Sequence, residues 1–119
     1  MRVGVCLNKR VDPRWAADCD QLSGCRAVVM GLGLQAGGLC VARFLRDKGA
    51  EVVVTDLRTA DELRPSVEAL GVEGVRYVLG RHDVEDFRAA DLVVRNPAVR
   101  DGSPYLVEAR KAGVHVETE

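Results

Sequence analysis

Short aliphatic runs alternate with amphipathic segments along most of this chain. Runs rich in valine and leucine, typical of strands buried on both faces, fall at 26–30, 51–55, 75–79, 91–95 and 114–116. The segments between them carry apolar residues at helical spacing. Strands that alternate with helices in this way predict right-handed crossovers and a parallel sheet. We therefore expect an α/β fold, a Rossmann-like doubly wound parallel five-stranded sheet in a single domain, with strand order 3-2-1-4-5.

The segments between the strands predict helices with recognisable start signals. Residues 59–62 have the pattern of a capping box, but Pro65 lies inside the helix that would follow. That helix therefore starts either at the box or at Pro65, since proline is favoured at the first helical position. Asp83 is expected to cap a short helical turn, and Ser103 followed by Pro104 is a strong start for the last helix.

Composition and charge narrow the class of protein. The chain of 119 residues is 47% hydrophobic and 29% charged, with a net charge of −1 and no basic stripe. It is long enough for one core, and nucleic acid is an unexpected partner. No apolar run approaches the ~20 residues that a membrane span needs, and no secretory signal is evident. We expect a cytoplasmic protein that does not bind membranes.

Cysteine usage indicates a reducing compartment. No two cysteines form a C-x-x-C pair, and both histidines lie far from them, so a zinc site is not expected. Cys40, on the helix after the first strand, is expected to be a small core residue. The four residues expected to be free thiols are Cys6, Cys19, Cys25 and Cys40.

The domain boundary is predicted from the position of the first strand. Residues 25–119 are expected to form the Rossmann-like domain, and residues 1–24 an N-terminal extension. The extension carries weak helix and strand signals. Ordered packing, a mobile arm and an unnatural start all remain open for it.

A glycine-rich turn, residues 31–38, separates the first strand from the first helix. Strand, glycine turn and helix form the geometry in which a phosphate approaches backbone N–H groups at a helix N-terminus. Gly33 would let a ligand approach the backbone, and Ala36 stands where a strict G-x-G-x-x-G pattern has its third glycine. Gly37 and Gly38 add two more. Close packing of helix on sheet without a ligand is the alternative explanation.

Other candidate residues follow the remaining strands. Asp56 ends the second strand near the offset where an acidic residue accepts a hydrogen bond from a ribose hydroxyl. Arg58 could neutralise a phosphate or stack on a base. Gly80 and Asn96 end the third and fourth strands, at the edge where ligands of open α/β sheets bind, although both also suit plain turns. His82 is expected to be a surface histidine. No ATP phosphate loop and no catalytic set is present, so we assign no catalytic residue and no metal ligand.

Three stretches together resemble one family of ligases. They read GLGLQAGGLCVARFLRDKGAEVVVTDLR, RYVLGRHDVEDFRAADLVVRNPAV and SPYLVEARKAGVHVETE. They are similar to the N-terminal domain of the Mur ligases that add D-glutamate to UDP-N-acetylmuramoyl-L-alanine in peptidoglycan synthesis. In that family this domain holds the UDP part of the substrate. The resemblance implies UDP contacts at Gly33, Leu34, Gln35, Gly37, Asp56, Leu57, Arg58, Gly80 and Asn96.

The resemblance also implies what this chain lacks. The family's central domain binds ATP and Mg²⁺, and its C-terminal domain helps to bind ATP and D-glutamate. Both are absent here, so we expect this chain to bind no cofactor, to be inactive alone and to be a monomer. The alternative from another class is an NAD(P)-binding Rossmann domain of a dehydrogenase or regulator, because the glycine turn and Asp56 alone do not separate the two.

Overall fold

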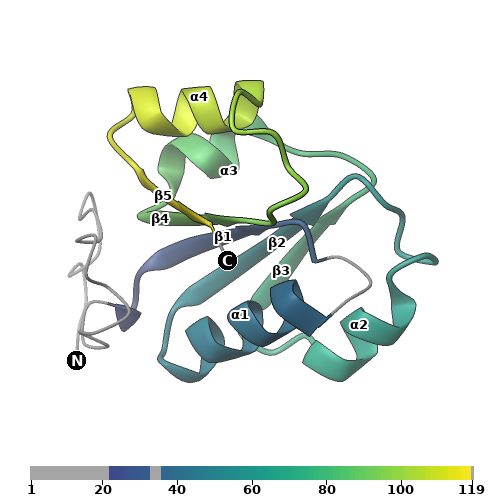
Figure 1. The fold of residues 1–119 in the computed structure, drawn as a ribbon. Coiled ribbons are helices and arrows are strands. Elements are labelled where there is room, and N and C mark those ends of the chain that lie inside the picture. The colour runs from purple at the N-terminus through teal and green to yellow at the C-terminus, as the bar shows by residue number, and fades with distance from the viewer. Residues whose placement is uncertain (1–21, 33–35, 119) are drawn as a thin grey trace.

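The fold is seen in a computed structural model, which describes residues 22–32 and 36–118. A parallel sheet of five strands has the order β3-β2-β1-β4-β5, which confirms the predicted strand order. Helices connect the strands, as Figure 1 shows. The elements are β1 (Arg26–Met30), α1 (Ala36–Asp47), β2 (Glu51–Asp56), α2 (Arg64–Leu70), β3 (Val75–Leu79), α3 (Val84–Ala89), β4 (Leu92–Arg95), α4 (Pro104–Lys111) and β5 (His115–Thr118).

The helices form two layers that cover opposite faces of the sheet. In Figure 1, α3 and α4 lie above the sheet and α1 and α2 lie below it. Alternate residues of β1 and β2 point to opposite faces. Val29 and Val54 join the core between the sheet and α1, whereas Val28 and Val53 join the core between the sheet and the layer of α3 and α4. The strands therefore read as continuous aliphatic runs because both of their faces are buried.

Strand β1 is the centre of the sheet. It pairs with β2 on one side, with Ala27 beside Val52, and with β4 on the other, with Ala27 beside Leu92. At the amino end of this pairing, the buried Asp91 carboxylate accepts a hydrogen bond of 3.0 Å from the Arg26 N–H. The core also includes a residue that precedes β1, because Leu22 is fully buried between the sheet and α1.

The structure decides the open question about the second helix. The capping-box hydrogen bonds between Thr59 and Glu62 are present, with the Thr59 N–H 3.0 Å from a Glu62 carboxylate oxygen. The helix itself starts at Arg64, with Pro65 in its first turn. Proline is tolerated there because the first helical N–H groups have no partner within the helix. Asp83 caps α3 as predicted, accepting a hydrogen bond of 3.0 Å from the Glu85 N–H.

The expectation that Cys40 is a core residue was wrong. Its side chain is exposed, whereas Gly38 and Ala42 on the same helix are buried. A step of two residues turns a helix by about 200°, so Cys40 lies on the face opposite its two buried neighbours.

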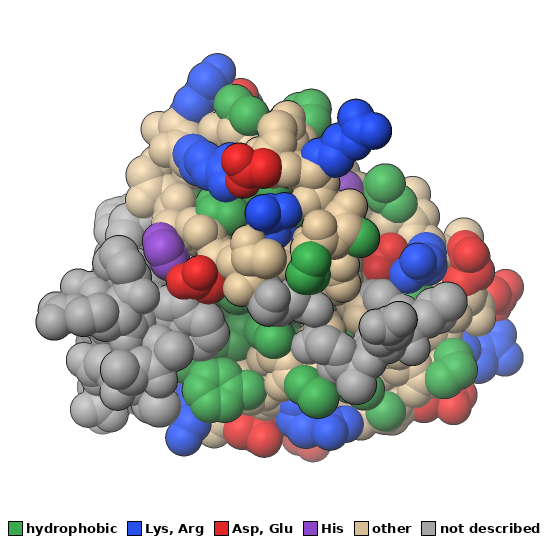
Figure 2. Space-filling model, viewed as in Figure 1, with side chains coloured by type: hydrophobic (Ala, Val, Ile, Leu, Met, Phe, Trp, Pro, Cys, Tyr) green, Lys and Arg blue, Asp and Glu red, His purple; other side chains and the backbone are tan. Residues whose placement is uncertain are grey.

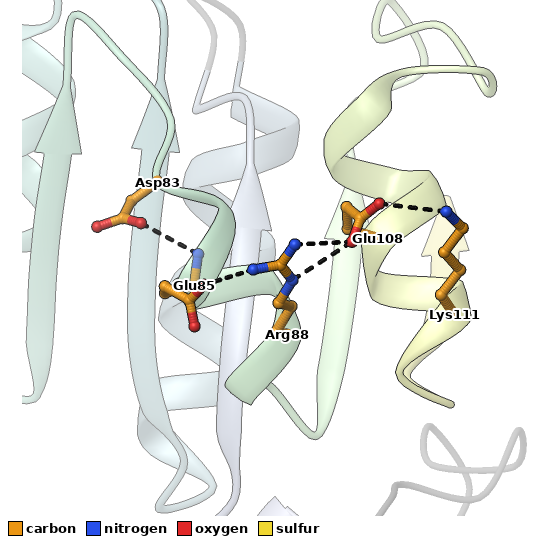
Figure 3. Close-up of polar contacts among 5 residues, drawn as sticks. All are labelled: Asp83, Glu85, Arg88, Glu108 and Lys111. Atoms are coloured by element: carbon orange, nitrogen blue, oxygen red, sulfur yellow. Dashed lines mark hydrogen bonds and ion pairs between the residues drawn. The ribbon is translucent and has the colours of Figure 1, made fainter.

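A surface network of charges joins α3 to α4 (Figure 3). The Arg88 guanidinium donates to a Glu85 carboxylate oxygen at 2.5 Å and to a Glu108 carboxylate oxygen at 2.9 Å. Lys111 lies 3.5 Å from the second Glu108 oxygen. The hydrogen bond from Arg88 is the main reason that the pKa of Glu108 lies below its ordinary value. The network links the two helices at the surface, where exposed ion pairs contribute little to stability.

Candidate nucleotide site at the carboxyl edge of the sheet

The carboxyl ends of the four strands β1 to β4 meet at one edge of the sheet. Backbone hydrogen bonds of 2.8 Å run from the Gly31 N–H to the Thr55 carbonyl and from the Asn96 N–H to the Met30 carbonyl. The Gly80 N–H donates to the Asp56 carbonyl, also at 2.8 Å. The strand order reverses between β1 and β4, so this edge is the switch point at which open α/β sheets bind ligands.

Asp56 points inward from the end of β2 and is buried, with 7% of its surface exposed. One carboxylate oxygen accepts from the Leu32 N–H at 2.9 Å, and the other accepts from the Arg58 N–H at 2.9 Å. Hydrogen bonds to a charged acceptor are among the stronger ones in proteins. The carboxylate therefore joins the start of the glycine turn to the loop after β2.

At Gly38, helix α1 packs tightly against the backbone that follows β1. A Cβ atom at this position would lie 2.5 Å from the Gly31 carbonyl oxygen and 2.6 Å from the Leu32 carbonyl oxygen. Only a glycine permits this approach. The pattern placed the third glycine of the motif at position 36, and the structure finds the tight contact two residues later. Two adjacent glycines at the start of a helix, where they are poor helix formers, were the signal for it.

The remaining predicted residues divide into placed and unplaced positions. Gly33, Leu34 and Gln35 lie outside the described residues. Gly37 belongs to the first turn of α1, which carries no acidic residue. An anion at this helix end would thus meet no opposing carboxylate from the first turn.

Two side chains after β2 extend into solvent. Leu57 is 66% exposed and Arg58 is also exposed. An exposed leucine beside an exposed arginine offers an apolar surface and a cation to a ligand, whereas Asp56 beside them faces the protein. Asp56 therefore stabilises the backbone at this edge, and the side chains of Leu57 and Arg58 are accessible to a ligand.

Gly80 and Asn96 follow β3 and β4, on the two sides of the β2–β1 pair. Gly80 has φ +79, a conformation that favours glycine, and a Cβ there would meet nothing within 4 Å. Its N–H also donates to the Arg58 carbonyl at 2.8 Å. The Asn96 side-chain oxygen accepts from the Ala98 N–H at 2.9 Å. The Cβ atom of Asn96 lies 2.8 Å from the place of a Cβ on Gly31, so β4 closes against the glycine turn.

His82 is more buried than expected. Its Nδ1 lies 2.6 Å from the hydroxyl oxygen of Thr55, which is fully buried. Its ring makes edge contacts with Phe87 of α3 and Tyr105 of α4, with centroids 6.0 Å and 5.0 Å apart. The ring is half-buried, which the local turn alone did not indicate. The rings come from elements that follow in the chain.

The pKa of His82 lies below its ordinary value of 6.5, mainly because burial penalises the charged ring, although the Asp56 carboxylate opposes this. The unfolded chain takes up a proton near the ordinary pKa and the folded chain only at lower pH. We therefore expect the free energy of unfolding to fall as pH drops from about 7.5 to 5.5. Urea unfolding at both pH values measures this. The loss should be smaller in His82→Asn and unchanged in His115→Asn, and equal losses in all three proteins would contradict the assignment.

A separate hollow of about 400 Å³ lies at the opposite edge, among residues that include Arg26, Glu51, Arg76 and Asp86. Arg76 and Asp86 form an ion pair there, so their charges neutralise each other. Ligands of parallel sheets bind at the carboxyl ends, and we assign no site to this hollow.

The described surface carries charges of both signs. On the face in Figure 2, Lys and Arg side chains are interspersed with Asp and Glu side chains. Within residues 22–32 and 36–118, no group of three His, Cys, Asp or Glu side chains is arranged to hold a metal ion. In the same ranges, no helix has both the length and the apolar character to cross a membrane.

Comparison with known proteins decides the family. A family model described as "Mur ligase MurD-like, N-terminal domain" matches residues 25–118. The chain belongs to this family. The resemblance predicted from the three sequence stretches is thereby confirmed.

Two curated relatives of this MurD-like domain show the extent of the match. The chain is 57% identical over 99 residues to the UDP-N-acetylmuramoylalanine--D-glutamate ligase of Roseiflexus sp. (strain RS-1). The matched stretch covers 83% of this chain and 21% of the relative. It is 50% identical over 99 residues to the ligase of the same name from Geobacter metallireducens, covering 83% of this chain and 22% of the relative. The chain thus spans about one fifth of the length of these relatives.

Solved structures support the MurD-like fold. A pseudomurein peptide ligase type C from Methanothermus fervidus superposes with a TM-score of 0.62 at 27% identity, covering 80% of this chain and 19% of that one. The dipicolinate synthase A chain of Bacillus subtilis gives 0.56 at 20% identity, covering 82% of this chain and 38% of that one. The second likeness shows the Rossmann-like fold alone.

Proposed function

We propose that this domain binds the uridine diphosphate part of UDP-N-acetylmuramoyl-L-alanine. The observation that carries the proposal is the carboxyl edge of a MurD-like domain, where Asp56 holds the glycine turn and leaves Leu57 and Arg58 free to reach a ligand. The apolar Leu57 side chain would pack on the uracil, and Arg58 would lie beside the ribose. Gly80 and Asn96 would contact the ligand from the ends of β3 and β4.

The diphosphate is assigned to the start of α1. By the family resemblance, it would meet backbone amides of the glycine turn, including those of Gly33, Leu34, Gln35 and Gly37. The partial positive charge of a helix N-terminus favours such an anion. The absence of an acidic residue in the first turn of α1 supports this assignment.

For a full-length protein that contains this domain, we propose the activity named in its relatives, the ligation of D-glutamate to UDP-N-acetylmuramoylalanine. The family resemblance implies that this reaction uses ATP. ATP, Mg²⁺ and D-glutamate would then be bound by parts of the protein beyond this domain. The domain would hold the substrate by its nucleotide end and leave its carboxylate free to react. We expect the 119-residue chain alone to show no D-glutamate-dependent ATP hydrolysis, and a measurable rate would refute this.

Calorimetric titration of the chain separates the proposed function from the dehydrogenase alternative. We expect weak binding of UDP-N-acetylmuramoyl-L-alanine and of UDP, and none of NADH at the same concentrations. Tight binding of NADH with none of the uridine ligands would reverse the conclusion.

Arg58→Ala is expected to weaken UDP binding about three- to tenfold without lowering the unfolding midpoint, because the side chain is exposed and surface changes affect stability little. Arg64→Ala is the matched control, since Arg64 is an exposed arginine that pairs with Asp61 on the surface. Titration of both variants with UDP measures the difference. Equal affinities in the two variants would remove Arg58 from the site.

A further inference from the structure

His82 occupies a junction between the carboxyl edge and the helices above it. It follows Gly80 by two residues, and its ring is half-buried against Phe87 of α3 and Tyr105 of α4. These helices form the upper layer in Figure 1. A histidine held on two sides by aromatic edges has a defined ring orientation, so its two nitrogens have different surroundings.

The hydrogen bonds around Thr55 select one tautomer of His82. The Thr55 hydroxyl oxygen lies 2.6 Å from His82 Nδ1 and 3.2 Å from the Arg81 carbonyl oxygen. A hydroxyl has one proton, and a carbonyl can only accept. Both contacts are hydrogen bonds only when Thr55 donates to Arg81 and His82 Nδ1–H donates to Thr55. The neutral ring then carries its proton on Nδ1.

This bond lies one residue from Asp56. The Asp56 carboxylate holds the Leu32 N–H, and the Asp56 carbonyl accepts from the Gly80 N–H. The ends of β2 and β3 are also joined by an isolated bridge between Asp56 and Arg81. The pair formed by Thr55 and His82 thus joins the end of β2, which carries Asp56, to the loop after β3, which carries Gly80.

We propose that His82 is a positioning residue that, through its Nδ1–H bond to Thr55, holds the loops after β2 and β3 in the arrangement that binds a uridine nucleotide. The identity of the ligand in this inference rests on the proposed function, whereas the role of His82 rests on the hydrogen bonds of Thr55. His82 acts through Thr55 and Asp56 and need not touch the ligand. The competing explanation is a histidine that only fills space between Phe87 and Tyr105, for which any apolar side chain of similar size would serve.

The tautomer is measured first, in the chain without ligand. The chain has only two histidines, so the ring ¹⁵N signals of His82 are assigned by their persistence in His115→Asn. We expect a protonated Nδ1 and an unprotonated Nε2 at neutral pH. The reverse pattern, with the proton on Nε2, would overturn the inference whatever the chain binds.

Affinity for UDP is measured next, by calorimetry at a temperature where every variant is folded. His82→Leu is expected to weaken binding about three- to tenfold, the effect of one lost hydrogen bond. His82→Asn keeps an N–H donor near the place of Nδ1 and should recover most of the affinity. Thr55→Val should match His82→Leu, Thr55→Ser should resemble the unchanged chain, and His115→Asn is the matched control.

The double variant tests whether the two residues act as one. Thr55→Val combined with His82→Leu should cost no more than either change alone, because both remove the same bond. Additive losses, or equal affinities in His82→Leu and His82→Asn, would support the space-filling explanation and overturn the positioning role.

The failure of the proposed function would be recognised separately. If the unchanged chain binds no uridine nucleotide, the ligand assignment fails. The positioning role is then judged by amide hydrogen exchange, in which Gly80 should exchange faster in His82→Leu than in His82→Asn. Equal exchange rates would overturn the positioning role as well.

Discussion

Gly38→Ala is expected to lower the free energy of unfolding by about 2 kcal/mol, the result of strain that outweighs the better helix propensity of alanine. The new Cβ would lie 2.5 Å and 2.6 Å from the carbonyl oxygens of Gly31 and Leu32. Both oxygens belong to backbone at the end of the central strand. The strain is therefore relieved only if α1 moves away from the turn.

Gly102→Ala is the matched control. A Cβ at Gly102 would meet nothing within 4 Å. Its backbone shows no positive φ, so the change should be neutral or slightly stabilising by its effect on the unfolded chain. Urea unfolding should show a loss of stability in Gly38→Ala and none in Gly102→Ala. A neutral Gly38→Ala would mean that α1 is not seated on the turn as described.

Asp56→Ala is expected to cost about 3 kcal/mol and to abolish measurable UDP binding. Hydrogen bonds to a charged group contribute about 1.5–3 kcal/mol each, and this change removes two. The Leu32 N–H is buried and would stay unpaired, whereas the Arg58 N–H is partly exposed and can turn to water. The expected loss is therefore nearer that of one buried bond than of two.

Asp91→Ala separates stability from binding. Asp91 is also a buried aspartate that accepts from a strand N–H, that of Arg26, but it lies at the amino edge of the sheet. Asp91→Ala should destabilise the domain about as much as Asp56→Ala does, but it should leave the affinity of the folded protein for UDP unchanged. Urea unfolding and calorimetry measure the two effects. If Asp91→Ala weakens binding as much as Asp56→Ala does, the carboxyl edge is not the site.

The strand order and most element positions could be predicted from sequence because they depend on local signals. Valine-rich runs mark strands that are buried on both faces, and Pro65 and Asp83 mark helix starts. The family followed from stretches that combine these signals with the glycine turn. These features need no knowledge of which residues meet across the fold.

The internal structure of the site could not be predicted in this way. The bonds from Asp56 to Leu32 and from Thr55 to His82 join residues 24 and 27 positions apart. Alternation gives the face of a strand on which a residue lies, but it does not give the partner that a polar side chain finds there. Asp56 was expected to face a ribose, and it faces the glycine turn. Whether it also touches a ligand stays a prediction.

The position of β1 has a consequence for how the site is assembled. Its neighbour β4 arrives late in the chain, and the bond between Arg26 and Asp91 closes a separation of 65 residues. The contact between the glycine turn and Asn96 forms only after this distant half has docked. A compound that contacts both segments would recognise the finished sheet alone. By mass action it would raise the melting temperature by an amount that grows with the logarithm of its concentration over its dissociation constant. Thermal shift against a panel of uridine compounds would then rank ligands without any catalytic assay.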